Sequence, residues 1–502
     1  MRSASRRPWR LLGLAAVAGL IGSASCAVGT GVAPGVSGGS VRGAGRLEAG
    51  AAVRVITPEL GDPDRPVYIG GLRRSWKASG VHDDLYARAL VLSDAGGSSV
   101  GLVVLDLIGF FHDDVEAVRA KLGRQHPEVR LDYLVVASTH THAGPDVLGL
   151  WMPIGSTVDG GYIARVRSAA VEAVAEAWSR RRAVVLSVGV GSAPGLSQDT
   201  RLPRLTDDHV LVMGLRSANG GEPVAALVNW NSHPSVSGKD NREISADFPR
   251  SVIRVMETRW GGTALYASGA LGGQIGSGRL RLIDPETGLR PPSRLRLAEL
   301  VGERIGEIAL GALRAAESSG EAGPPPRLKV RSRAIRIPLD NPRFTTGLAI
   351  GLIRPRRLYP RDGIGAGWLP SELPDPNSLR PGAFTMRSEV GVVDLGPARW
   401  ALVPGELYPE LSLGRFQEPQ DPGADFQGVA LEPPLRPQSD LPLFVICLAN
   451  DELGYIIPRS QWDDEPPYAY GRSRPQYGEK NSSGPLTAPV IMKTLSEILT
   501  ND

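Results

Sequence analysis

Short apolar runs alternate with helical patterns from Ala51 onward, and this alternation limits the possible folds more than any other feature of the chain. Several runs are continuous stretches of Val, Leu and Ala, which is typical of strands covered on both faces. The segments predicted as strands are Val100–Leu107, Leu131–Ser138, Ala183–Val188, Val210–Leu215, Val224–Trp230, Ala264–Ala267, Leu328–Ile337, Glu389–Leu395 and Leu443–Leu448. The predicted helices are Ile163–Arg181, Leu297–Glu317 and Ala488–Leu499. This mixture favours an α/β (α+β) fold, in which mixed β-sheets are layered with helices in a single large domain.

The composition excludes several classes of protein. Of the 502 residues, 42% are hydrophobic and 22% are charged, which excludes disordered and collagen-like chains. The two cysteines, Cys26 and Cys447, are too few for a disulfide scaffold or a cysteine-rich zinc module. The formal net charge is +3, but four arginines lie in the first ten residues, so a chain that begins at Cys26 would carry −1. Nucleic acid is therefore not expected as a partner.

The first 48 residues are predicted to lie outside the folded domain. Residues 1–26 are typical of an export signal, because arginines precede the apolar run Leu11–Ile21 and small residues precede Cys26. Cys26 also fits a lipoprotein cysteine, so we expect an exported protein that is secreted, periplasmic or lipid-anchored at the bacterial cell envelope. The alternative is a disordered basic leader. Residues 27–48 are predicted to be a flexible tether, and residues 49–502 the folded domain.

Three histidines follow predicted strands directly. His140 and His142 come after Leu131–Ser138, and His233 comes after Val224–Trp230. Side chains at strand ends face the crevice where open α/β sheets bind their ligands, so the three imidazoles are expected at one site. Imidazole suits zinc, and a catalytic zinc needs three or four nitrogen or oxygen ligands. The alternative is a set of polar residues whose hydrogen bonds are satisfied at strand ends.

Two further candidate ligands follow apolar segments late in the chain. Glu406 comes after a Pro-Gly turn, which lets its side chain project sharply, although a glutamate near a helix N-terminus has the same pattern. Tyr455 follows Leu443–Leu448, and its phenol could bind a metal or stabilise an oxyanion, although a packed aromatic side chain is the simpler interpretation. The chain has no GxSxG, HExxH or Walker A motif.

Several motifs, taken in order, resemble the catalytic domain of neutral ceramidases. The segment Thr139-His140-Thr-His142-Ala-Gly-Pro145 is close to that family's Thr-His-Thr-His-Ser-Gly-Pro, and Asn229-Trp-Asn-Ser-His233-Pro234 resembles its second histidine motif. Pro404-Gly-Glu406, Gly454-Tyr455-Ile-Ile-Pro and Tyr477-Gly-Glu479 resemble three later motifs. The resemblance runs from about Ala51 to Tyr477 and does not include the immunoglobulin-like domain that often follows in the family.

The resemblance implies hydrolysis of the amide bond of ceramide to a fatty acid and a sphingoid base. Carried over by motif, the Zn²⁺ ligands would be His140, His233, Glu406 and Tyr455. His142 and Tyr477 would act in catalysis beside the metal, and Arg201 and Gln274 would contact the substrate.

One departure from the family bears on the substrate. Gln274 or Ile275 stands where the family has a serine that is needed for activity. Two alternative functions therefore remain: a zinc hydrolase of the same fold that acts on another amide or ester, and a non-catalytic surface lipoprotein.

Residues 338–386 are rich in Pro, Arg and Gly and are predicted to form a long excursion from the core. The apolar run Thr346–Ile353 is followed at once by Arg354, Arg356 and Arg357. An apolar stretch with a cationic edge is typical of contact with an anionic membrane surface. The alternative, which we favour, is that Leu348–Ile353 packs on the core.

Overall fold

The computed structural model describes residues 40–41, 47–275, 279–319, 326–362, 367–373 and 378–500. The predicted export signal and most of the predicted tether lie outside the described residues. Two parts of the predicted tether, residues 27–48, are described. Ser40–Val41 pairs with a central strand, and Leu47 begins another strand, so these parts belong to the fold. Every helix in the described ranges is too short or too polar to cross a bilayer.

The larger sheet has the strand order β11-β9-β8-β7-β2-β4-β5-β6, with β1 also paired to β7. Its strands are β1 (Ser40–Val41), β2 (Leu47–Val55), β4 (Tyr86–Ser93), β5 (Ser99–Leu105), β6 (Tyr133–Ser138), β7 (Arg182–Ser192), β8 (His209–Ser217), β9 (Pro223–Trp230) and β11 (Thr263–Ser268). The terminal pairs β11–β9 and β5–β6 are parallel, and the pairs between them are antiparallel. The sheet is therefore mixed, as expected.

A smaller sheet has the order β12-β14-β15-β17, with β13 paired to β14. Its strands are β12 (Lys329–Pro338), β13 (Leu358–Pro360), β14 (Phe384–Asp394), β15 (Arg399–Leu402) and β17 (Leu443–Ile446). Two short parallel pairs complete the described strands: β3 (Gly80–Val81) with β10 (Glu243–Ile244), and β16 (Glu406–Leu407) with β18 (Tyr455–Ile456).

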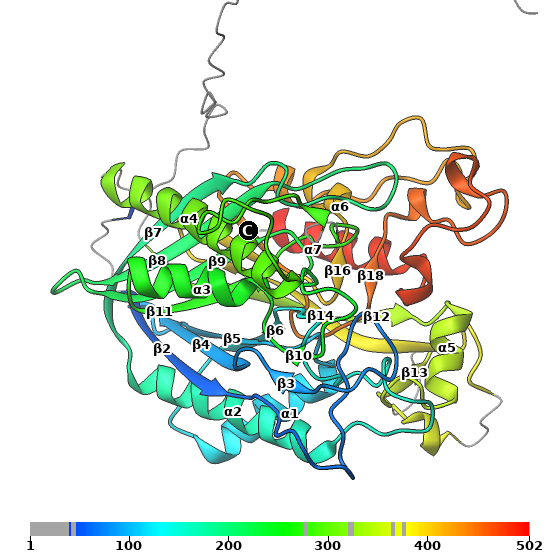
Figure 1. The fold of residues 1–502 in the computed structure, drawn as a ribbon, viewed down its shortest axis with the longest axis horizontal. Helices are drawn as coiled ribbons and strands as arrows, with labels where there is room; N and C mark the ends of the chain where they lie inside the picture. The colour runs from blue at the N-terminus through cyan, green and yellow to red at the C-terminus, as the bar shows by residue number, and fades with distance from the viewer. Residues whose placement is uncertain are drawn as a thin grey trace, which may run out of the picture. The chain divides into compact units, whose positions relative to one another are not determined.

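Helices cover the outer face of each sheet, and a shared core joins the two sheets (Figure 1). The helices are α1 (His112–Gln125), α2 (Gly160–Ser179), α3 (Phe248–Arg259), α4 (Arg294–Ser319), α5 (Pro342–Ala349), α6 (Pro409–Leu413) and α7 (Thr487–Thr500). Helix α2 packs on β2 and β4, α4 on β7 and β8, and α7 on β12 and β14. Side chains such as Leu102, Leu227, Trp400 and Phe444 fill the space between the sheets. The predicted layered α/β fold in a single domain is thus confirmed.

The excursion at residues 338–386 contains α5 and β13 and packs on the rest of the fold. Leu348 and Ile353 are buried in the main core. Arg354 pairs with the buried Asp114, and Arg356 Nη2 lies 2.6 Å from Asp451 Oδ2. The apolar side chains Leu348 and Ile353 are therefore packed on the core, as the packing alternative predicts, whereas Arg356 is buried, Arg354 is half-buried and Arg357 is exposed.

Candidate metal centre

The two strands that carry the histidine motifs lie near opposite ends of the larger sheet. The chain after β17 joins these ends, because Cys447 N donates to Ser268 O (2.9 Å) at the end of β11 and Asn450 N donates to Val136 O (2.7 Å) in β6. Ser268 Oγ also donates to Thr139 O (2.7 Å). Cys447 is fully buried, and burial raises the pKa of its thiol to about 12. This crossing segment brings the ends of β6 and β9 to one site.

His140 presents one ring nitrogen to the centre of this site. Its φ of 68° is a backbone conformation that non-glycine residues rarely adopt, and such strain concentrates at functional sites. Its Nδ1 lies 2.5 Å from Ile108 O, and because a carbonyl can only accept, this nitrogen carries the proton. The lone pair of Nε2 is then free, and this atom lies 3.4 Å from Glu406 Oε2.

Glu406 and Tyr455 are placed side by side by the pairing of β16 with β18, in which they are direct partners. Glu406 Oε2 lies 2.8 Å from His233 Nε2, and Tyr455 Oη lies 3.2 Å from the same nitrogen. His233 is fully buried, and its main-chain N donates to Gln274 O (3.0 Å). The four predicted metal ligands therefore converge, with their donor atoms directed at one another.

Three distances between neighbouring donor atoms are close to those of a tetrahedral metal site. Ligand atoms about 2.0–2.1 Å from a zinc ion lie roughly 3.3 Å apart in tetrahedral geometry, and the three measured separations are 2.8, 3.2 and 3.4 Å. In addition, His140 Nε2 faces the Glu406 carboxylate at 3.4 Å, an arrangement that either a proton on Nε2 or a bound cation satisfies. The described chain thus has the chemistry of a metal site, although it does not identify the metal.

The protonation states also suit a metal. Burial acts to raise the pKa of Glu406, but the charges of His140 and His233 and their hydrogen bonds outweigh it and hold that pKa well below its usual range. Burial lowers the pKa of His233, although Glu406 opposes this effect. The ionised carboxylate is the form in which Glu406 would bind a metal, and the lowered pKa of His233 favours the neutral ring that a metal needs.

His142 lies beside this cluster without a partner of its own. Its ring centroid is 4.7 Å from that of His140 and 5.5 Å from that of His233. Both ring nitrogens are buried and lack a hydrogen-bond partner. Burial, followed by the charges of His140 and His233, lowers the pKa of His142 well below its usual value. Its ring packs so closely on Gly71 that an added Cβ there would lie 2.5 Å from the ring.

The three imidazoles could also form a metal site by themselves, since one nitrogen of each lies within 4.8 Å of the others.

Tyr477 lies at the exposed side of the cluster. Its ring centroid is 5.5 Å from that of Tyr455, in an edge-to-face arrangement, and 43% of the residue is exposed. Its hydroxyl accepts from Asn481 Nδ2 (3.0 Å). The structure thus places the second predicted catalytic residue next to a predicted ligand and within reach of solvent.

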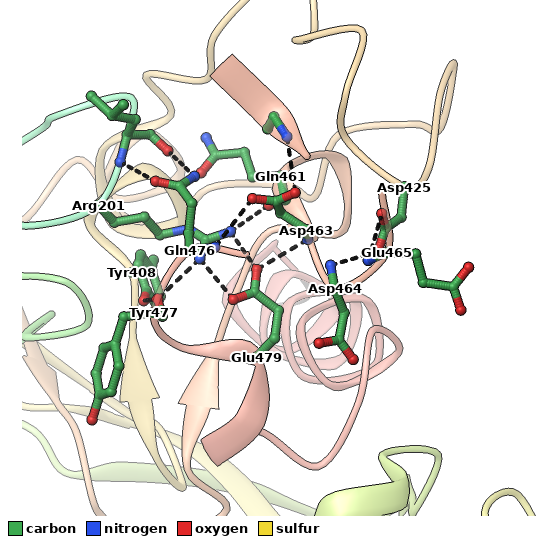
Figure 2. Close-up of polar contacts among 12 residues, drawn as sticks. Arg201, Tyr408, Asp425, Gln461, Asp463, Asp464, Glu465, Gln476, Tyr477 and Glu479 are labelled. Atoms are coloured by element: carbon green, nitrogen blue, oxygen red, sulfur yellow. Dashed lines mark hydrogen bonds and ion pairs between the residues drawn. The ribbon is translucent and has the colours of Figure 1, made fainter. Parts of the chain in front are cut away.

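Arg201 and Gln274, the two predicted substrate-binding residues, are buried at 2% and 0% exposure. The guanidinium of Arg201 is engaged by Glu479 and by main-chain carbonyls (Figure 2). Gln274 Nε2 donates to Ala270 O (2.5 Å), and Gln274 Oε1 accepts from Asp207 N (3.2 Å). Both residues brace the loops around the site, so their predicted contact with substrate gains no support from the structure.

The sequence analysis missed Glu479, Tyr408 and Ile108 as supports of the site. Glu479 follows Tyr477 by two residues, and its buried carboxylate holds Arg201. Its place in a motif beside a predicted catalytic tyrosine was the available signal. Tyr408 is fully buried, with its ring centroid 5.7 Å from that of Tyr455. No pattern marks Ile108, because only its main-chain carbonyl is used.

A cleft of about 1080 Å³ lies alongside the segment that follows the histidine motif. Pro145 and Asp146 line it, together with Tyr68, Met152 and parts of residues 58–67 and 155–165. This volume is in the range of small-molecule sites.

Fold and site together define a layered α/β protein with a buried histidine–carboxylate cluster suited to a metal. Two solved structures resemble it over most of its length. Neutral ceramidase from Pseudomonas aeruginosa has a TM-score of 0.64 at 18% identity, over 91% of this chain and 74% of that one. A structure described as ceramidase complexed with C2 has a TM-score of 0.66 at 16% identity, over 91% and 75%. No family model and no curated protein matches the sequence. The chain therefore has a ceramidase-like fold.

Proposed function

We propose that this protein is a zinc-dependent amidohydrolase that cleaves the N-acyl amide bond of ceramide-like lipids and releases a fatty acid and a sphingoid base. The observation that carries the proposal is the convergence of His140, His233, Glu406 and Tyr455, with neighbouring donor atoms 2.8–3.4 Å apart. The ceramidase-like fold supports the choice of reaction. The resemblance of the motifs supports the choice of bond.

The four converging residues would hold the zinc, which when bound supplies a Lewis acid for the amide carbonyl and lowers the pKa of water. The ring nitrogens of His142 are buried and unpaired, so this side chain is placed to take a proton from the attacking water. It then delivers that proton to the amine nitrogen as the C–N bond breaks. The Tyr477 hydroxyl, at the open side of the site, donates to the carbonyl oxygen as negative charge develops there.

The test is amine release from N-acyl sphingoid bases by the purified full chain, before and after removal of metal. Chelation should lower turnover at least about 100-fold, and one equivalent of zinc should restore it. His140→Ala should remain inactive after the same addition. Turnover that persists after complete removal of metal would contradict the proposal. Purified protein that takes up far less than one metal ion would favour the non-catalytic alternative.

A second candidate is hydrolysis of a different amide or an ester at the same site. Gln274 favours it, because either this residue or Ile275 stands where the family that the motifs resemble has a serine. Here the side chain is fully buried and bonded to Ala270 and Asp207, so it offers no hydroxyl to a substrate. A panel of short and long N-acyl amines and esters separates the two functions. Strong preference for a short soluble substrate would favour the second candidate.

A further inference from the structure

A buried ion pair lies directly behind Tyr477 (Figure 2). Arg201 Nη1 donates to Glu479 Oε2 (2.9 Å), and Arg201 Nη2 donates to Glu479 Oε1 (2.5 Å), which makes the pair bidentate. The same two nitrogens donate to main-chain carbonyls, Nη1 to Tyr477 O (3.0 Å) and Nη2 to Gln461 O (2.5 Å). The exposed fractions are 2% for Arg201 and 1% for Glu479, so neither side chain reaches a substrate in the open part of the site.

The segment that carries Tyr477 is tied to the Arg201 loop on its other side as well. Gln476 Oε1 accepts from Leu202 N (2.8 Å), and Gln476 Nε2 donates to Leu202 O (2.9 Å). Beyond Tyr477, Asn341 Nδ2 donates to Glu479 O (2.8 Å). Gln476, directly before Tyr477, and Glu479, two residues after it, are therefore anchored by hydrogen bonds that are partly or fully buried.

The Tyr477 side chain has contacts of its own, and its main chain is held as well. Its hydroxyl bonds to the partly exposed Asn481 and to the Tyr455 hydroxyl, and its ring meets the edge of Tyr455. Its main-chain carbonyl accepts from Arg201 and from the hydroxyl of the buried Tyr408 (3.4 Å). The ion pair therefore holds the backbone from which the phenol extends.

We propose that Glu479 and Arg201 are positioning residues, whose ion pair fixes the Tyr477 phenol at the mouth of the metal site. The inference rests on the proposed function, because it assigns these two residues to the role of Tyr477 in that function. Neither residue contacts the reacting atoms. A displacement of about 1 Å at a group that takes part in the reaction can lower the rate about 100-fold. Loss of the ion pair can therefore lower the rate although neither residue touches the substrate.

The test is a double-mutant cycle with Tyr477→Phe and Glu479→Ala. Glu479→Ala should lower kcat about 10- to 100-fold with little change in KM, while the metal content stays at that of the parent. Glu479→Gln, which can still accept a hydrogen bond from Arg201, should recover part of the loss. In the Tyr477→Phe background, Glu479→Ala should cause less than about a twofold further loss, because the hydroxyl it positions is already gone.

A second readout does not depend on activity. With 3-fluorotyrosine incorporated at position 477, the parent should give one narrow ¹⁹F resonance, and Glu479→Ala should give a broadened or shifted one. The matched control is Glu389→Ala, which breaks the partly buried pair with Arg119 and the hydrogen bond from Tyr133. This control should change neither kcat nor the ¹⁹F signal.

Additive losses in the cycle, or an unchanged ¹⁹F signal in Glu479→Ala, would overturn the positioning role. If Glu479→Ala fails to fold, Glu479→Gln takes its place in the cycle and in the ¹⁹F measurement under the same criteria. An inactive parent, or full activity in Tyr477→Phe, would instead contradict the proposed function, and the ¹⁹F comparison would still decide whether the pair positions residue 477.

Discussion

His140 and His142 are two residues apart in one motif, and the structure gives them different surroundings. His140 has one nitrogen fixed by Ile108 O and the other facing Glu406, whereas His142 has no partner for either nitrogen. We therefore expect His142→Ala to retain one metal ion per chain and to lose at least about 100-fold in kcat, as for a general acid–base. Metal analysis and turnover together test this expectation. If His142→Ala loses the metal while Glu406→Ala retains it, the ligands are the three histidines.

Asp207, which is not a candidate ligand, should make stability depend on pH. It is fully buried, with Arg436 Nε 2.9 Å and His209 Nδ1 2.6 Å from its carboxylate. Burial acts to raise the pKa of Asp207, but the charge of Arg436 and the contacts with His209 outweigh it, so the pKa lies below its usual value. A lowered pKa in the folded state stabilises the fold above the unfolded value of about 3.9, and this contribution is lost as the pH falls further.

Asp207→Asn should therefore reduce the free energy of unfolding at pH 7 by about 3 kcal/mol. The difference from the parent should shrink below about pH 4, where the unfolded carboxyl becomes protonated. Urea unfolding at pH 7 and pH 3.5 measures both values. A difference that stays constant or grows on acidification would contradict the assignment.

At the scale of elements, apolar patterning predicted the strands and helices whose burial is continuous. Strands β5, β6, β9 and β11 and helices α2, α4 and α7 lie within a few residues of their predicted limits. The analysis did not predict β4 or α1, because their buried charges interrupt the pattern. Arg88 in β4 is paired with Glu257, and Asp114 in α1 with Arg167 and Arg354. Such partners lie far away in the sequence, so local periodicity cannot reveal them.

The candidate site could also be predicted only where local sequence patterns mark its residues. The histidines, Glu406 and Tyr455 follow apolar strands or turns, which local patterns show. Arg201 also lies near the site, but its side chain is held by Glu479, which is 278 residues away in the sequence. A substrate contact and a buried brace cannot be distinguished before that pairing is known.

The short pair β16–β18 places two of the candidate ligands, and Gly454 makes it possible. Gly454 has a φ of +79°, and an added Cβ would lie 1.9 Å from Asn481 O. Gly454→Ala should therefore displace Tyr455, lower the free energy of unfolding by about 2–4 kcal/mol and weaken metal binding. Chemical unfolding and metal titration measure the two effects. Gly123→Ala in α1, where an added Cβ meets no side chain or neighbouring element within 4 Å, is the control and should leave metal binding unchanged and stabilise the fold by at most about 1 kcal/mol. Parent-like metal affinity in Gly454→Ala would show that β18 does not position a ligand.

At the scale of the whole molecule, the metal site joins parts of the fold that are distant in the sequence. His140 follows β6, His233 follows β9, and Glu406 and Tyr455 lie on the pair next to the crossing segment 447–450. A ligand that binds only the folded state stabilises it by about 2.7 kcal/mol at 100 times its Kd. Zinc should therefore raise the Tm of the metal-free chain, and Glu406→Ala should abolish most of the increase. Calorimetry of the two chains with and without zinc tests this expectation, and an equal increase in both would place the stabilising metal elsewhere.

The central claim is that His140, His233, Glu406 and Tyr455 bind one metal ion. Anomalous diffraction from a crystal of the zinc-loaded protein, measured on both sides of the zinc absorption edge, tests it most directly. The account predicts one strong peak with His140 Nε2, His233 Nε2, Glu406 Oε2 and Tyr455 Oη about 2.0–2.2 Å away. The absence of a peak at these atoms, or a peak coordinated by His142 in place of Glu406, would contradict it.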